Sequence, residues 1–166
     1  MRAAWRVSKY DPNRRTAGGA YTVEDWTAVT DIGRSFGGVL LTQGEYLRVE
    51  QAYVDVVSAI YADAGSPILQ AHEVSIVDLM TTLPGQVCSS APSESEAVRD
   101  VAAVVRSCLR EMFWCKLESS DRTAMIHFGY DFYLYLVGMD VTEQRQEMAA
   151  ARRIFIEPFQ SPYASH

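Results

Sequence analysis

Between residues 112 and 137, apolar residues alternate with other residues in three short runs, as in β-strands with one buried face. One face of these strands is apolar throughout and is formed by Phe113, Cys115, Leu117, Ala124, Ile126, Phe128, Phe132, Leu134 and Leu136. Polar turns at 119–122 and 129–131 separate the runs. The pattern predicts an antiparallel meander, because short turns join antiparallel neighbours.

The lengths of the two turns predict the alignment of the strands. A four-residue first turn would place Lys116 opposite Met125. A three-residue second turn would place Phe128 opposite Phe132, whereas a two-residue turn would mix the two faces. We favour the three-residue turn because it keeps the apolar residues on one side of the sheet.

Three segments show the apolar spacing of amphipathic helices, at about 43–63, 95–111 and 142–154. Thr42 and Ser93 each stand three residues before a glutamate, which is the signature of a capping box at a helix start. Apolar runs at 4–9 and 68–77 predict two further strands, although 77–80 also suits a helical turn.

The stretch 10–41 has no sustained pattern and contains several turn signals. Within it, Thr22 to Asp25 could cap one or two helical turns through Trp26. The order of elements is then strand, helix, strand, helix, three strands, helix. This order predicts an α+β fold, a mainly antiparallel sheet with helices packed on one face, in a single domain spanning 1–166.

The second face of the meander mixes aromatic and charged side chains, which is unusual for a sheet face left to water. Its candidate binding residues are Trp114, Lys116, His127, Tyr133 and Tyr135. Trp and Tyr anchor many protein interfaces, so one interpretation is a partner-binding surface. In the other interpretation, these residues form a second packing layer beneath the 10–41 stretch or the last helix. The sequence leaves both open.

The net charge of −6 at pH 7 bears on the kind of partner. It argues against nucleic acid, because binding phosphates depends on Lys and Arg, and it suits a basic protein. Glu24, Asp25 and Asp31 surround Trp26 in the long stretch, and we add these four to the candidate binding residues as an acidic rim.

The composition, with 48% hydrophobic and 22% charged residues, is ordinary for a globular protein. No apolar run approaches the ~20 residues that cross a bilayer. The first nine residues lack the apolar stretch of a signal peptide. We therefore expect a cytoplasmic protein without membrane contact, and the sequence indicates no oligomeric state.

No motif for catalysis or cofactor binding stands out, and the interpretation leans away from an enzyme. The histidines and cysteines are His72, His127, His166, Cys88, Cys108 and Cys115, and their spacing matches no metal site or disulfide framework, so no metal or cofactor is expected. The alternative is a small enzyme or ligand-binding protein. It would have a cleft between the 10–41 stretch and the sheet, and would use His127 with acids such as Asp31.

Two parts of the chain resemble small bacterial proteins of uncharacterised families and immunity proteins of interbacterial toxin systems. They are 21–33, and 113–118 together with 127–133. The resemblance implies an antitoxin-like protein that occludes a protein partner, for example a basic toxin domain. It assigns no role to an individual residue.

Overall fold

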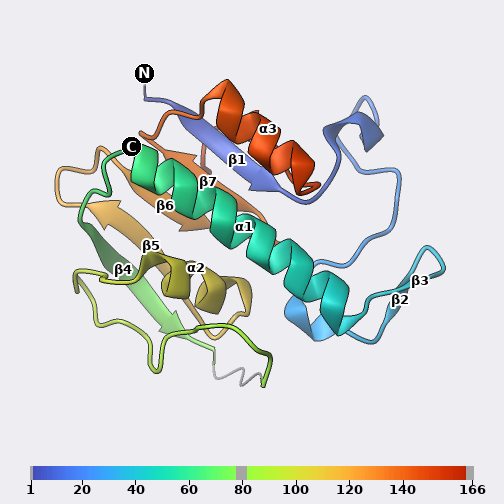
Figure 1. Ribbon diagram of the computed structural model, residues 1–166, viewed down its shortest axis with the longest axis horizontal. Helices are drawn as coiled ribbons and strands as arrows, with labels where there is room; N and C mark the ends of the chain where they lie inside the picture. Colours follow the sequence, from blue (N-terminus) through green and yellow to red (C-terminus); the bar gives the residue numbers. More distant parts are fainter. Residues whose placement is uncertain (1, 78–81, 164–166) are drawn as a thin grey trace.

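The computed structural model describes residues 2–77 and 82–163. Its main sheet has six strands in the spatial order β4-β5-β6-β7-β1-β8, and all neighbours are antiparallel. These strands are β1 (Ala4–Ser8), β4 (Leu69–Ile76), β5 (Phe113–Ser119), β6 (Met125–Phe128), β7 (Leu134–Val137) and β8 (Phe155–Pro158). The helices are α1 (Gln43–Asp63), α2 (Val101–Leu109) and α3 (Glu143–Ala151), which lie on one side of the sheet (Figure 1). The predicted α+β fold is confirmed.

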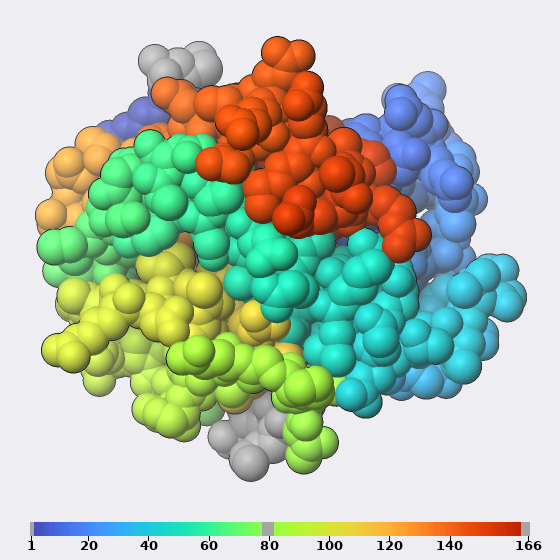
Figure 2. Space-filling view, viewed as in Figure 1, coloured from blue at the N-terminus to red at the C-terminus, as the bar shows by residue number. Residues whose placement is uncertain are grey.

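The core lies between the sheet and the helices. The apolar residues that recur at helical spacing along α1 are buried, namely Tyr46, Val49, Tyr53, Val57 and Ile60. Phe113 and Ile126 both belong to this core, so the apolar face of the meander is assigned correctly. Seen from this side, α1, α3 and the segment before α2 form most of the surface (Figure 2). Because α1, α2 and α3 all lie on this side, the opposite face of the sheet carries no helix within residues 2–77 and 82–163.

The first helix starts where predicted, but its capping box is only half formed. The Thr42 side chain accepts a hydrogen bond from the Glu45 amide at 3.1 Å. The Glu45 carboxylate does not return to the Thr42 amide, because it pairs with Arg48 at 2.9 Å. One of the orphan amides at the helix start is therefore satisfied by the cap.

A buried charge cluster joins the first two helices. Glu50 on α1 is fully buried and accepts hydrogen bonds from Arg106 at 2.9 Å and from Arg110 at 2.7 Å, both on or next to α2. Arg110 also donates to the Leu83 carbonyl at 3.0 Å. Because an unpaired buried charge is costly, the cluster fixes α2 and the segment before it against α1.

The two turns of the meander have the predicted lengths but lie one residue later than predicted. Glu118 pairs with Met125, so the four-residue turn is 120–123. Phe128 pairs with Leu134 and Gly129 hydrogen-bonds to Tyr133, so the three-residue turn is 130–132. Each shift moves the register by two residues. The predicted pairs were therefore wrong, yet the two faces stayed separate, since side chains alternate with a period of two.

The second predicted helix begins too early. Ser95 to Val98 instead run along the outer edge of β4, where the Val98 amide donates to the Leu69 carbonyl at 2.8 Å. The helix starts after Asp100, whose side chain accepts from the Ala103 amide at 3.0 Å. Covering the β4 edge satisfies backbone groups that would otherwise be unpaired, which outweighs the helical spacing. Of the suggested turn at 77–80, residues 78–80 lie outside the described residues.

The last predicted helix ends early, and a strand takes its place. Helix α3 stops at Ala151, before the predicted end at 154, and Phe155 pairs with Ser8 as part of β8. The segment after β8 then returns across the sheet, where Ser161 contacts His127 and Tyr163 contacts Tyr135.

The 10–41 stretch contains short elements rather than the helical turn predicted at 22–26. These elements are η1 (Pro12–Arg14), η2 (Val29–Asp31), β2 (Ser35–Phe36) and β3 (Val39–Leu40). Trp26 is buried among the helix-side aromatics, with its ring centroid 5.4 Å from Tyr46 and 5.1 Å from Phe132. The Trp26 side chain anchors the stretch to the core, although the stretch itself has little regular secondary structure.

Candidate functional site

A row of aromatic and ionisable residues crosses the helix-free face of the sheet. In order from β4 to β8, its members are His72, Lys116, His127, Tyr135, Arg6 and Glu157. Cross-strand neighbours of this kind interact directly. What covers the row decides which members can meet a partner.

The chain after β8 covers one half of this face. The rings of Phe159 and Tyr163 each lie 5.9 Å from the ring of Tyr135. The Arg6 guanidinium lies 4.0 Å from the centre of the Phe159 ring, a cation–π contact. Tyr135 is consequently only 5% exposed and His127 is fully buried.

His127 fastens this C-terminal segment, residues 159–163, to the sheet. Its Nε2 lies 3.1 Å from the Glu118 carboxylate, and its Nδ1 lies 3.0 Å from the Ser161 hydroxyl. Burial lowers the pKa of His127, and the nearby Glu118 carboxylate opposes this effect only in part. We therefore assign a neutral ring in which Nε2–H donates to Glu118 and Nδ1 accepts from Ser161.

Ser161, His127 and Glu118 form a hydrogen-bonded chain of a serine, a histidine and a carboxylate, which is the composition of a nucleophilic triad. Here the serine is not presented to a substrate, since Ser161 is only 4% exposed. Its oxygen also accepts a hydrogen bond from the Tyr163 amide at 3.2 Å. The arrangement therefore serves to hold the C-terminal segment rather than to activate a nucleophile.

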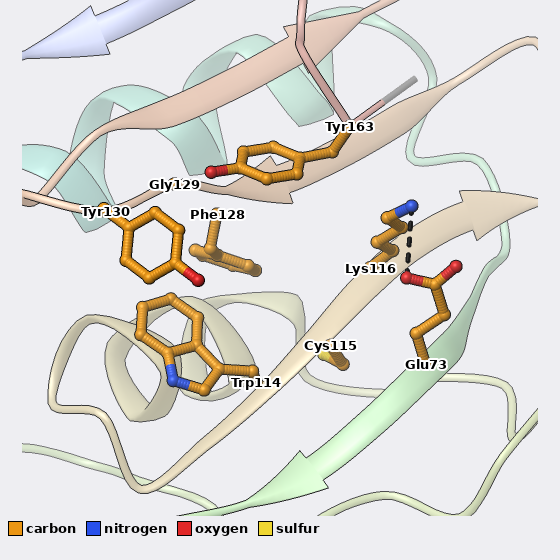
Figure 3. Close-up of a pocket in the computed structure, with 8 residues that line it drawn as sticks. All are labelled: Glu73, Trp114, Cys115, Lys116, Phe128, Gly129, Tyr130 and Tyr163. Atoms are coloured by element: carbon orange, nitrogen blue, oxygen red, sulfur yellow. Dashed lines mark ion pairs between the residues drawn. The ribbon is translucent and has the colours of Figure 1, made fainter. Parts of the chain in front are cut away.

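The other end of the face, over β5, remains open. It contains a cavity of about 260 Å³ lined by Glu73, Trp114, Cys115, Lys116, Phe128, Gly129, Tyr130 and Tyr163 (Figure 3). Trp114 and Lys116 are half-buried, whereas Tyr130 is 78% exposed. We refer to this region as the Trp114 cavity.

A β-bulge in β4 positions Glu73, a charged residue that lines the Trp114 cavity. The register shifts between His72 and Ser75, and Glu73 adopts a left-handed conformation with φ of 53°. The Glu94 carboxylate holds the bulge by accepting from the Glu73 amide at 2.9 Å, and this bond helps to lower the pKa of Glu94. The bulge directs the Glu73 side chain to Lys116, 3.1 Å away.

Of the predicted sheet residues, Trp114 and Lys116 line the open cavity, whereas His127 and Tyr135 are covered. Tyr133 is half-buried, with Tyr10 5.5 Å away, so the start of the 10–41 stretch does border this face. The packing interpretation thus applies to the half that holds His127 and Tyr135, whereas the half at β5 is open. Sequence reasoning did not include Glu73, Tyr130 and Tyr163, because they come from a bulge, a turn and the C-terminal segment.

The four acidic-rim residues do not lie beside the Trp114 cavity and are mostly structural. Asp25 pairs with the buried Lys9 at 2.9 Å, and Trp26 is only 6% exposed. The Asp31 carboxylate accepts from the Thr27 amide at 2.9 Å and pairs with Arg34 at 3.0 Å. Glu24 is exposed and lines none of the cavities described here.

A cavity of about 340 Å³ does exist beside the 10–41 stretch, with Lys9, Tyr10 and Asp25 in its lining. It contains neither His127 nor Asp31, so the residues of the alternative site are not brought together there. Burial lowers the pKa of Lys9 to about 8, and the ammonium lies 4.1 Å from the ring centres of both Tyr10 and Trp26. These contacts explain how a lysine is accommodated beneath the stretch.

No protein-family model, curated protein or solved structure matches the chain. Among the helices of the described ranges, none has the length and apolar character to cross a membrane. Within the same ranges, no three His, Cys, Asp or Glu side chains gather in a way that could hold a metal ion.

Proposed function

We propose that this protein binds another protein through the Trp114 cavity and acts as a non-enzymatic inhibitor of the antitoxin or immunity type. The observation that carries the proposal is the open end of the helix-free face, where aromatic walls surround an accessible recess. Aromatic side chains in such recesses are the usual anchors of protein interfaces.

The size of the cavity favours a side chain over a small-molecule ligand. Its volume of about 260 Å³ is below the ~300–1,000 Å³ that ligand pockets occupy. The polar group best suited to acid–base chemistry, His127, is fully buried and faces Glu118 and Ser161. These two observations favour binding over catalysis.

The expected partner is a basic protein, for example a toxin domain in the same cytoplasm. The chain carries a net charge of −6, and opposite net charges speed the encounter of two proteins. The covered half of the face would take no direct part, since its side chains are already packed.

The test uses the product of the neighbouring gene as the partner and measures its binding by biolayer interferometry. Trp114→Ala should weaken binding by at least ~2 kcal/mol, or roughly thirtyfold in Kd, as expected for an interface anchor. The matched control is Ile68→Ala, which truncates a 74% exposed side chain just before the far end of β4 and should leave the affinity unchanged. Equal effects of the two variants, or no binding at all, would contradict the proposal.

A further inference from the structure

Two carboxylates beside Trp114 have no cationic partner among the residues that the structure describes. Glu111 and Asp131 line a narrow cleft that shares Trp114, Phe128 and Gly129 with the Trp114 cavity. Within residues 2–77 and 82–163, neither carboxylate forms an ion pair. The surroundings of Trp114 therefore carry uncompensated negative charge.

Among the described residues that line the Trp114 cavity, Lys116 is the one cation, and it does not offset this charge. Lys116 lies 3.1 Å from Glu73, so these two charges neutralise each other. Figure 3 shows this pair on one side of the cavity, with Trp114 and Tyr130 on the other side and Tyr163 above. The charge that remains comes from Glu111 and Asp131. Partial burial raises the pKa of Glu111, as expected for a carboxylate that lacks a counter-charge.

The aromatic walls add to the attraction for a cation. The faces of aromatic rings are electron-rich, and tryptophan attracts cations most strongly. A guanidinium group suits such walls better than an ammonium group, because it is planar, stacks on rings and is more weakly hydrated.

We infer that the Trp114 cavity receives the guanidinium group of an arginine side chain on the protein partner. The arginine stacks on Trp114 and is drawn in by the carboxylates of Glu111 and Asp131. This inference rests on the proposed function and specifies which chemical group of the partner the surface recognises. The cavity, of about 260 Å³, has room for one such side chain.

The experiment titrates the full chain, labelled with ¹⁵N, with three capped pentapeptides in which arginine, citrulline or leucine is flanked by glycines. The indole N–H signal of Trp114, identified from the Trp114→Phe spectrum, reports binding. The arginine peptide should shift this signal and bind at least about fivefold more tightly than the citrulline peptide, which has the same shape without the charge.

Charge variants test the carboxylates without removing the aromatic walls. The double variant Glu111→Gln, Asp131→Asn should weaken the arginine peptide about fivefold. Asparagine tolerates the left-handed backbone at position 131, where φ is 59°. The matched control is Glu24→Gln, an exposed carboxylate that lines neither cavity at Trp114 and should leave peptide binding unchanged.

The outcomes separate this inference from the proposed function. Equal binding of the arginine and citrulline peptides, tighter binding of the leucine peptide, or no shift at Trp114 would each overturn the arginine assignment. The proposed function would still stand if Trp114→Ala weakened binding of the protein partner. Arginine-peptide binding without any partner binding would support the cation site and count against the inhibitor role.

Discussion

The two halves of the helix-free sheet face contain the same kinds of residue but differ in what covers them. Over β6, β7 and β1, the C-terminal segment packs on Tyr135 and fastens to His127, so both are buried. Over β5, Trp114 and Lys116 remain partly exposed beside an open cavity. An aromatic sheet face is therefore compatible with both a second packing layer and a binding surface. A segment that is distant in sequence decides between them.

Substitutions in the two halves should distinguish a packing layer from a binding surface. The loss of stability in Tyr135→Ala is the largest effect that we expect from this comparison. Tyr135→Ala should lower the free energy of unfolding by about 3 kcal/mol, because it removes a ring buried beneath the C-terminal segment. Trp114→Ala should cost less, about 1–2 kcal/mol, because Trp114 is only partly buried and borders an open cavity. Urea unfolding followed by circular dichroism measures both values.

Ile126→Ala is the reference for this comparison. Ile126 is fully buried on the helix side, so its truncation should cost roughly 2–5 kcal/mol. If Trp114→Ala reached the same range, the open half would also be a packing layer, and the binding surface would lie elsewhere.

Removing the C-terminal segment should expose the covered half of the sheet face, so that both halves are open. Ending the chain at Pro158 deletes the contacts of Phe159, Ser161 and Tyr163. We expect a loss of about 2 kcal/mol in the free energy of unfolding, near the value for burying one aromatic side chain, because Phe159 is 40% exposed in the intact chain. Increased binding of the dye ANS would report the uncovered aromatic surface.

The double variant Phe159→Ala, Tyr163→Ala keeps the chain length and is the control for this truncation. It should reproduce most of the stability loss if the ring contacts hold the segment. A truncated chain as stable as the intact one would mean that the segment is not fastened to the sheet.

The sequence was sufficient for the faces of the meander but not for its exact register. Moving a turn by one residue shifts the register by two and leaves the alternation intact, so burial cannot distinguish the two alignments. The second turn includes Phe132, a bulky residue with φ of 65° whose side chain is nevertheless 5% exposed. Such a strained turn residue is not expected from local preferences, and its contacts with Trp26, Tyr46 and Tyr53 offset the strain.

The candidate site was predictable only where it lies on regular strands. Trp114 and Lys116 follow from alternation in β5. Glu73 depends on a bulge, and Tyr163 on a segment that returns across the sheet after β8. The charge pattern was misleading for a related reason, since Asp25 pairs with Lys9, just after β1, and Asp31 accepts a hydrogen bond within the 10–41 stretch. Long-range packing of this kind leaves no local pattern in a single sequence.

The smallest expected effect is a pH response confined to the covered half. Burial lowers the pKa of His127 below its ordinary value of 6.5 in the folded protein, against the opposing effect of Glu118. Lys116 adds to the lowering and Glu73 opposes it. Below about pH 6.5 the unfolded chain takes up a proton on His127 that the folded chain resists. The free energy of unfolding should therefore fall as the pH drops through this range, and level off once the folded form is also protonated.

His127→Gln isolates this contribution, because glutamine does not titrate and can still donate to Glu118 and accept from Ser161. Urea unfolding of both proteins between pH 5 and 8 gives the difference that belongs to His127, since the carboxylates titrate in both. The wild type should lose stability relative to the variant on acidification, while arginine-peptide binding at Trp114 should be the same in both proteins at each pH. If the wild type instead gained stability relative to the variant at low pH, His127 would be charged in the folded protein and paired with Glu118. The C-terminal segment would then be held by an ion pair rather than by a neutral hydrogen-bond chain.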